Sequence, residues 1–295
     1  MNTAQSIDRP QLAPHESLPM YAVSAELAPR IQAFDLERNV REMEELGFTV
    51  IDDVAPDDFI DRLRAAVREE ALRHKGDYFG ITSHGASCDM LLDRENSVFG
   101  EAVTNAKVLA MIEYMCGRNA LVSQVSGSVR FQGATAMEVH CDQDWMPAPM
   151  PEHNALITAC WYTDDITEAG AGATKVIPGT HRLRRQPSAA ESQAQQGAEP
   201  ILCRKGSVGL WDGRLWHSNY GRELPGDRVL LHATYCRLAY RPLEDYAPIA
   251  QQLIERHGEP MAQLLGRDLW FGNRAFNAGG VDMSKYANTW ASARR

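Results

Sequence analysis

His140 and Asp142 are the pair of residues whose types and spacing most clearly suggest chemistry. If residues 136–142 form a β-strand, successive side chains alternate between its faces, so this imidazole and carboxylate project from the same face. With a second histidine they would form the two-histidine, one-carboxylate set that leaves coordination positions open, as in non-haem iron oxygenases. The spacing alone is weak evidence, because His-x-Asp occurs by chance in many chains.

A candidate for the second histidine lies at position 217. Segments 206–211 and 214–219 predict two strands joined by an Asp-Gly turn, which is a strong hairpin signal. Alternation places His217 and Asn219 on the same face of the second strand, from which His217 could reach the metal across a barrel. The alternative is a histidine that is satisfied by a backbone carbonyl.

Arg228 begins another predicted strand, 228–238, and shares a face with Leu230, His232 and Thr234. A guanidinium on an apolar, inward strand face is costly unless it holds an anion, and its planar fork suits a carboxylate. The alternative is an ion pair with a nearby Asp or Glu.

Composition limits the partners of this 295-residue chain, which has a formal net charge of -9. An acidic protein does not suit nucleic acid or an anionic membrane, so a small-molecule substrate is expected. The six cysteines contain no C-x-x-C pair and predict reduced thiols in a cytoplasmic protein. The polar, proline-containing start predicts no secretory signal, and no apolar run is long enough for a transmembrane helix.

The order of the elements predicts a mainly β protein with flanking helices. Short runs rich in Val, Ile, Thr, Trp and Tyr alternate with Gly, Pro and Asp turns from residue 121 onward, which is typical of a double-sheet jelly roll. The strands expected there are 121–132, 136–142, 155–164, 173–177, 206–211, 214–219 and 228–238. Helices are expected at 24–46, from Pro56 to His74, at 96–115 and at 242–265, with a short strand at 48–51. Residues 76–95 and 272–295 are expected to be mostly loop or coil.

We expect a single domain over residues 1–295. It comprises a flexible arm (1–23), a helical N-terminal part (24–118), the jelly-roll core (119–240) and a helical C-terminal part (241–295). Residues 184–200 are rich in Ala, Gln and Ser and predict a mobile insertion, for which we consider a role as an active-site lid.

Four motifs in order resemble those of the phytanoyl-CoA dioxygenase-like family of Fe(II)/2-oxoglutarate oxygenases. They are His140-x-Asp142, 163–170 (Thr-Asp-Asp-Ile-Thr-Glu-Ala-Gly), 176–181 (Val-Ile-Pro-Gly-Thr-His), and His217 followed by Arg228. The likeness covers roughly residues 48–237 and is far more specific than any single motif.

The resemblance implies a double-stranded β-helix (jelly roll, cupin-like) with iron bound by His140, Asp142 and His217. Arg228 would pair with the distal carboxylate of 2-oxoglutarate. Asn219 stands where the family usually has a hydroxyl, and Gln124 is a further candidate for a co-substrate contact. The implied cofactor is Fe(II), with 2-oxoglutarate and O2 as co-substrates.

The residues at neighbouring motif positions have other expected roles. His181 resembles a structural histidine, and His153 is expected in a surface loop. Asp144 shares the strand face of His140 and could replace Asp142 as ligand if the strand bulges.

The implied reaction is oxidation, most simply hydroxylation, of an unactivated C–H bond of a small molecule, with release of succinate and CO2. Natural-product tailoring is the leading context, and Asp142 speaks against halogenation, because related halogenases carry a small residue there. Candidate substrate contacts are aromatic: Trp145, Trp161, Trp211, Trp216, Tyr78 and Phe79. Arg130 and Arg214 could recognise an anionic substrate, although solvated strand ends are the commoner explanation.

Two other functions stay open at this point. One is a metal-dependent cupin-type enzyme that does not use 2-oxoglutarate, and the other is a non-catalytic jelly-roll binding module. A homodimer is the oligomeric alternative that we keep open.

Overall fold

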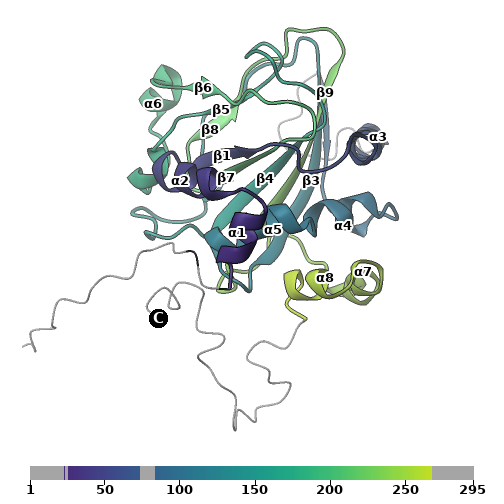
Figure 1. The fold of residues 1–295 in the computed structure, drawn as a ribbon. Helices are drawn as coiled ribbons and strands as arrows, with labels where there is room; N and C mark the ends of the chain where they lie inside the picture. Colours follow the sequence, from purple (N-terminus) through teal and green to yellow (C-terminus); the bar gives the residue numbers. More distant parts are fainter. Residues whose placement is uncertain (1–22, 24–25, 74–83, 268–295) are drawn as a thin grey trace, which may run out of the picture.

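The computed structural model describes Val23, residues 26–73 and residues 84–267. Its strands are β1 (Phe48–Ile51), β2 (Gly85–Cys88), β3 (Leu121–Phe131), β4 (Leu156–Tyr162), β5 (Thr174–Val176), β6 (Glu199–Pro200), β7 (Val208–Asp212), β8 (His217–Asn219) and β9 (Asp227–Cys236). Six of them form one sheet in the order β1-β7-β4-β9-β3-β2, and the other three form a smaller sheet in the order β6-β5-β8 (Figure 1). Neighbouring strands are antiparallel throughout both sheets. The expected mainly β architecture with flanking helices is confirmed.

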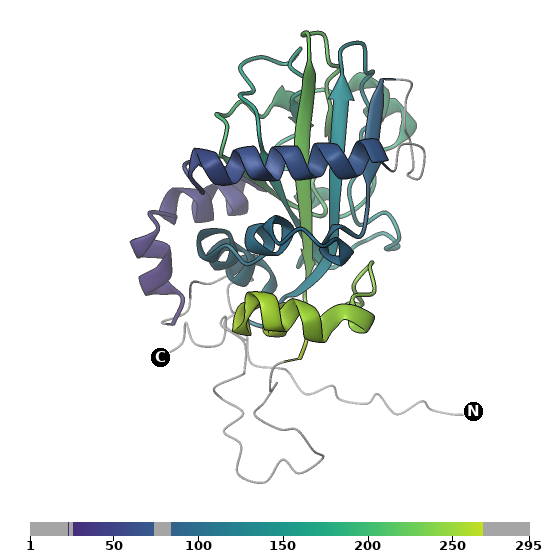
Figure 2. The same cartoon turned by 90° about the vertical axis from the view of Figure 1, so that its right-hand side faces the viewer.

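Most of the helices cover the outer face of the large sheet, whereas α6 lies beside the small sheet (Figure 1). The helices are α1 (Ala28–Ala33), α2 (Glu37–Glu45), α3 (Asp57–Arg73), α4 (Val98–Val103), α5 (Ala106–Cys116), α6 (Ala189–Ala194), α7 (Ala250–His257) and α8 (Glu259–Leu264), with short 3-10 turns η1 (Leu91–Asp93), η2 (Thr180–Leu183) and η3 (Ala247–Ile249). The long helix α3 crosses the strands of this sheet, with α4, α5, α7 and α8 below it (Figure 2). Apolar side chains between the helices and the sheet form the main core, in which Phe99, Tyr235 and Trp161 are fully buried.

A second apolar cluster fills the space between the two sheets. It includes Tyr162 and Cys160 from β4, Trp211 from β7 and Val176 from β5. The strands that carry the predicted functional residues therefore have one face on the helical core and the other toward the small sheet. This arrangement leaves the inner face of β3 and β9 available for a cavity.

Two of the predicted helices are each interrupted. The segment 24–46 contains α1 and α2, separated where Asp35 adopts a positive φ of 54°. The segment 96–115 contains α4 and α5, and the side chain of Asn105 accepts hydrogen bonds from the backbone N–H groups of Lys107 and Val108. Apolar periodicity continues through both breaks, but the positive φ of Asp35 ends the first helical run and the Asn105 cap begins a new helix in the second.

The predicted hairpin at 206–219 is wrong. β7 belongs to the large sheet and β8 to the small one, so the chain crosses between the sheets after Asp212. Oδ1 of Asp212 accepts hydrogen bonds from the backbone N–H and the Nε of Arg214, and both side chains are buried. This local ion pair fixes a turn that redirects the chain, where an Asp-Gly pair alone would predict a tight hairpin.

Three other segments differ from expectation. Residues 136–142 form no strand and contribute a single antiparallel bridge, from His140 to His217. Of the predicted loop 76–95, residues 84–95 contain β2 and η1, and residues 76–83 lie outside the described part. The insertion 184–200 contains α6, which begins with a capping box between Ser188 and Glu191, and β6.

Of the predicted helical segment 242–265, residues 247–264 form η3, α7 and α8, and residues 242–246 are not helical. Residues 1–22 of the expected arm 1–23 and the segment 272–295 lie outside the described residues, and the single-domain organisation stays a prediction. In the part of the chain that the structure describes, no helix combines the length and apolar character that a membrane span requires.

Candidate active site

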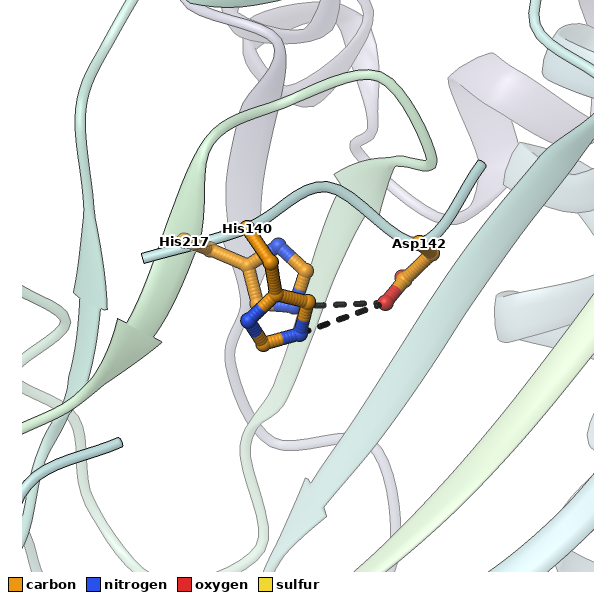
Figure 3. Close-up of side chains that lie close together, drawn as sticks. All are labelled: His140, Asp142 and His217. Carbon is orange, nitrogen blue, oxygen red and sulfur yellow. Dashed lines mark ion pairs between the residues drawn. The ribbon is translucent and has the colours of Figure 1, made fainter. Parts of the chain in front are cut away.

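Three side chains from separate parts of the chain meet between the sheets. One ligand atom from each of His140, Asp142 and His217 lies within 4.8 Å of the other two (Figure 3). Nε2 of His217 is 3.4 Å from Oδ1 of Asp142, and Nε2 of His140 is 4.0 Å from the same oxygen. Two imidazoles and one carboxylate at this separation match the facial set that the sequence predicted.

The backbone holds both imidazoles in one orientation. Nδ1 of His140 lies 2.9 Å from the carbonyl oxygen of Glu138, and Nδ1 of His217 lies 3.0 Å from that of Leu215. A carbonyl oxygen can only accept a hydrogen bond, so Nδ1 carries a proton in each ring and Nε2 is the nitrogen that faces the common centre. The bridge between the two backbones, with N–H to O distances of 3.0 and 2.8 Å, keeps the two rings side by side.

The carboxylate of Asp142 is oriented by its second oxygen. Oδ2 accepts hydrogen bonds from the hydroxyl of Thr158 and from Nε1 of Trp211, each at 3.0 Å, which leaves Oδ1 toward the histidines. Burial by itself would raise the pKa of Asp142, but His217, and then His140 and the Trp211 hydrogen bond, hold it well below its ordinary value. The carboxylate is therefore ionised, as a metal ligand must be.

The same network acts on the two histidines in opposite directions. Burial, and then the neighbouring His217, lowers the pKa of His140. Burial also opposes protonation of His217, but the charge of Asp142 outweighs it and raises its pKa. A cation at the centre would take the place of that proton beside Asp142, so the donor set suits a divalent metal.

The triad opens into a cavity of about 210 Å³. Alternating residues of two paired strands form one wall: Gln124, Ser126, Ser128 and Arg130 from β3, and Arg228, Leu230, His232 and Thr234 from β9. The triad and Asn219 lie on the cavity as well. Its size suits small molecules bound next to a metal.

Arg228 is buried in this wall, with 3% of its surface exposed. Its Nη1 donates to the carbonyl oxygen of Gly172 at 2.8 Å, while Nε is buried and has no hydrogen-bond partner. Burial, and then the nearby charge of Arg130, lowers the pKa of Arg228 to about 10, so it is still a cation at neutral pH. Among the described residues, Arg228 does not form the alternative ion pair with Asp or Glu. A buried cation without a counter-charge, next to three possible metal ligands, suits the binding of an anionic co-substrate.

The family model of phytanoyl-CoA dioxygenase matches residues 43–221, which is more than half of the chain. The chain belongs to the phytanoyl-CoA dioxygenase family. The resemblance seen in the four motifs is thereby confirmed.

Individual relatives are distant. The chain is 28% identical to dioxygenase af480 of Aspergillus fumigatus over 168 residues. This stretch covers 56% of this chain and 53% of that protein. It is 24% identical over 178 residues to the uncharacterised protein Rv1501 of Mycobacterium tuberculosis, covering 58% and 62% of the two chains. The chain thus spans between about half and three fifths of the length of these curated relatives.

Solved structures share the fold. HygX from Streptomyces hygroscopicus, with nickel and 2-oxoglutarate bound, superposes with a TM-score of 0.57 at 15% identity, over 70% of this chain and 89% of that one. The 2-oxoglutarate-dependent carbocyclase SnoK from nogalamycin biosynthesis gives 0.60 at 19% identity, over 73% and 90%. EctD from S. alaskensis superposes with a TM-score of 0.58 at 17% identity, over 70% of this chain and 80% of that one. The expected jelly-roll core of the phytanoyl-CoA dioxygenase family is confirmed by this likeness.

The two further co-substrate candidates both line the cavity. The Asn219 amide donates to the carbonyl oxygen of Tyr220 at 2.7 Å, and its buried Oδ1 has no partner. Gln124 donates to Oδ1 of Asp89 at 3.5 Å, a long contact that a ligand could replace. A co-substrate role for either residue stays a prediction.

Most of the predicted aromatic contacts lie away from this cavity. Trp161 is fully buried in the main core, Trp216 donates to the carbonyl of Arg185, and Trp145 is half-exposed beside Tyr240. None of these three rings lines the cavity, so a substrate bound there would not touch them. Trp211 does line it, and Tyr78 and Phe79 lie outside the described residues.

The neighbouring candidates fall into structural positions. Asp144 is exposed and does not join the triad. His181 is buried against Gly47, where an added Cβ would lie 2.4 Å from its Nδ1. His153 lies 3.0 Å from the hydroxyl of Tyr240, and the guanidinium of Arg214 is taken up by Asp212.

Sequence analysis did not identify the side chains that donate hydrogen bonds to the carboxylate of the triad, and it gave no role to one histidine of the cavity wall. Thr158 projects inward from β4, and alternation along that strand could have identified it. His232 was placed on the face of Arg228 but given no role, and burial, then the charge of Arg228, lowers its pKa to about 3. No local signal distinguishes Trp211 as a donor to Asp142 from a packing tryptophan.

Proposed function

We propose that this protein is an Fe(II)- and 2-oxoglutarate-dependent dioxygenase that oxidises, most simply hydroxylates, a C–H bond of a small molecule. His140, Asp142 and His217 would hold the iron, and Arg228 the distal carboxylate of 2-oxoglutarate, with Asn219 and Gln124 beside it. The observation that carries this proposal is the buried guanidinium of Arg228, with an unpartnered Nε, in the same cavity as the triad.

The residues of the chain supply position and protonation. The two Nδ1 to carbonyl contacts keep both imidazoles aimed at the centre, and the hydrogen bonds from Trp211 and Thr158 orient the Asp142 carboxylate. When bound, iron with O2 and 2-oxoglutarate supplies the oxidising power, and the co-substrate leaves as succinate and CO2. Asp142 would supply a carboxylate to the iron where related halogenases carry a small residue, so we propose oxidation without halogenation.

Natural-product tailoring is the context that we propose. Its support is that the structural neighbours include a carbocyclase and an epimerase from nogalamycin biosynthesis and HygX, which has been seen with hygromycin B. These names also show that the outcome of oxidation varies within the fold. A cytoplasmic location, a homodimer and the lack of nucleic-acid or membrane partners stay predictions.

Anaerobic titration tests the proposal. Fe(II) and 2-oxoglutarate are added to metal-free protein, and a weak visible charge-transfer band is expected once both are bound. A cupin-type enzyme without 2-oxoglutarate would bind the metal but give no band. A non-catalytic jelly-roll module would bind neither, so either outcome contradicts the proposal.

A further inference from the structure

Arg130 places a second guanidinium in the cavity wall, and it has no role in the proposed reaction. It lies directly opposite Arg228 in the register of β3 and β9, and both residues line the cavity. Residues paired in this way project from the same face, and like charges opposite each other are destabilising. The wall therefore concentrates positive charge at one point.

The described part of the chain offers Arg130 no counter-charge. Its one hydrogen bond there runs from Nη1 to the carbonyl oxygen of Thr135, at 3.2 Å, and it forms no ion pair. Asp142 is the one carboxylate among the described residues that line the cavity, and it is committed to the triad. Burial lowers the pKa of Arg130, as expected for a cation that leaves water without an anion beside it.

With metal and co-substrate bound as proposed, the formal charges in the cavity cancel except at Arg130. The charges of Fe(II) and of the dianion 2-oxoglutarate are equal and opposite, and Asp142 balances Arg228. The metal-binding histidines are neutral, and the pKa of His232 makes it neutral at pH 7 as well. One positive charge is left over on a wall that a substrate must touch.

Position separates the two arginines. Arg228 is almost fully buried, whereas Arg130 is half-buried and bonds to Thr135, which is exposed. Met137, in the same loop as Thr135, lines the cavity and is 45% exposed. Arg130 thus lies nearer the opening, where a molecule that enters after the co-substrate would meet it.

We infer that the prime substrate is a carboxylic acid whose carboxylate is bound by Arg130 near the mouth of the cavity. The planar guanidinium fork matches a carboxylate and would form charge-assisted hydrogen bonds with it. This inference rests on the proposed function and names the substrate class for the same site.

A paired ligand panel tests the inference. Protein loaded anaerobically with Fe(II) and saturating 2-oxoglutarate is titrated with small monocarboxylic acids of graded size and with their primary amides, and perturbation of the charge-transfer band reports binding without turnover. Parent protein should bind the best acids about tenfold or more tightly than their amides, the scale of a charge-assisted hydrogen bond. Arg130→Gln should abolish this preference, and Arg130→Lys should keep part of it. Arg204→Gln, at an exposed position outside the cavity, is the matched control and should keep all of it.

Three outcomes would overturn the inference. The acids could bind no better than the amides, or Arg130→Gln could keep the preference of the parent. Arg130→Gln could also require as much additional 2-oxoglutarate as an Arg228 variant, which would make Arg130 a co-substrate residue. Failure of the parent to form the band would instead contradict the proposed function, so the two failures are distinguishable.

Discussion

At the scale of single residues, the site depends on side chains whose polar atoms are already fixed or left free by the fold. Each ligand has one atom bound to the protein and another directed at the common centre. Arg228 has one nitrogen bound to Gly172 and one without a partner. Preorganisation of this kind lowers the cost of ordering the site when metal and co-substrate bind.

Replacing Arg228 tests the co-substrate contact. Arg228→Gln should raise the 2-oxoglutarate concentration for half-maximal charge-transfer absorbance by about tenfold or more, because a desolvated charge pair is lost. Arg228→Lys keeps the charge but not the planar fork, so the 2-oxoglutarate concentration that it requires should lie between those of the parent and of Arg228→Gln. A glutamine variant that titrates like the parent would show that Arg228 does not bind the co-substrate.

Replacing Trp211 tests the donor behind the carboxylate ligand. Trp211→Phe keeps a ring in place but removes the hydrogen bond to Oδ2 of Asp142, and Fe(II) affinity should fall about 10- to 100-fold, as for other partners of metal ligands. Trp216→Phe is the matched control, since it loses a hydrogen bond to the Arg185 carbonyl instead. Equal Fe(II) affinity in both variants would contradict this role.

At the scale of elements, one segment that follows later in the sequence, the insertion 184–200, holds the ligand-bearing chain in place. The Gln186 side chain accepts a hydrogen bond from the N–H of Cys141 at 3.0 Å and donates one to its carbonyl at 2.9 Å. Ser192, in α6, donates to the carbonyl of Val139 at 3.3 Å. The insertion 184–200 thus replaces the strand pairing that residues 136–142 lack, and it contacts the ligand segment directly.

Replacing Gln186 tests this support. Gln186→Leu should lower Fe(II) affinity several-fold, because the backbone between His140 and Asp142 loses both bonds while neither ligand changes. Gln193→Leu, on the exposed side of α6, should leave Fe(II) affinity unchanged. Metal titration of both variants, with thermal unfolding measured in parallel, separates a loss of site geometry from a loss of folding. Retention of parental Fe(II) affinity in Gln186→Leu would contradict the proposed support.

The 163–170 motif has a comparable role for β9. The hydroxyl of Thr163 donates to the carbonyl oxygen of Val229 at 2.7 Å, and Oδ2 of Asp164 accepts from its N–H at 3.1 Å. Arg64 of α3 donates to Oδ1 of Asp164 at 3.0 Å. The motif therefore fixes the residue next to Arg228 and ties it to the helical layer.

At the scale of the whole molecule, one partly buried carboxyl links stability to pH. Burial, and then the charge of Glu244, raises the pKa of Asp89 from 3.8 to about 6. The folded protein binds this proton more tightly than the unfolded chain, so its contribution to stability is complete below pH 3.8 and is lost as the pH rises through about 6.

Replacing Asp89 tests this linkage. Asp89→Asn keeps the shape without the charge, so its melting temperature should exceed that of the parent at pH 8, and the difference should shrink at pH 5. Differential scanning calorimetry at the two pH values measures both. A difference independent of pH, or one that grows at pH 5, would contradict the assigned pKa shift. Asp93→Asn, which removes an exposed carboxylate four residues away, is the control.

The sequence by itself determined the residues that could do chemistry and the strands on which most of them lie. Histidine, aspartate and arginine in spaced motifs are identifiable because few other side chains can bind a metal or a dicarboxylate. Strand alternation placed Arg228, Leu230, His232 and Thr234 on one face, and all four line the cavity. Helix positions were predicted because apolar periodicity is a local property.

Only the tertiary structure decided how those residues meet. The turn at Asp212 sends β8 into the other sheet, which brings His217 beside His140, and the irregular segment 136–142 is held by side chains from residue 186 onward. The opposition of Arg130 and Arg228 depends on the register of two strands about a hundred residues apart in the chain. These contacts are non-local, so local patterns of polarity and spacing carry no information about which partners they will have.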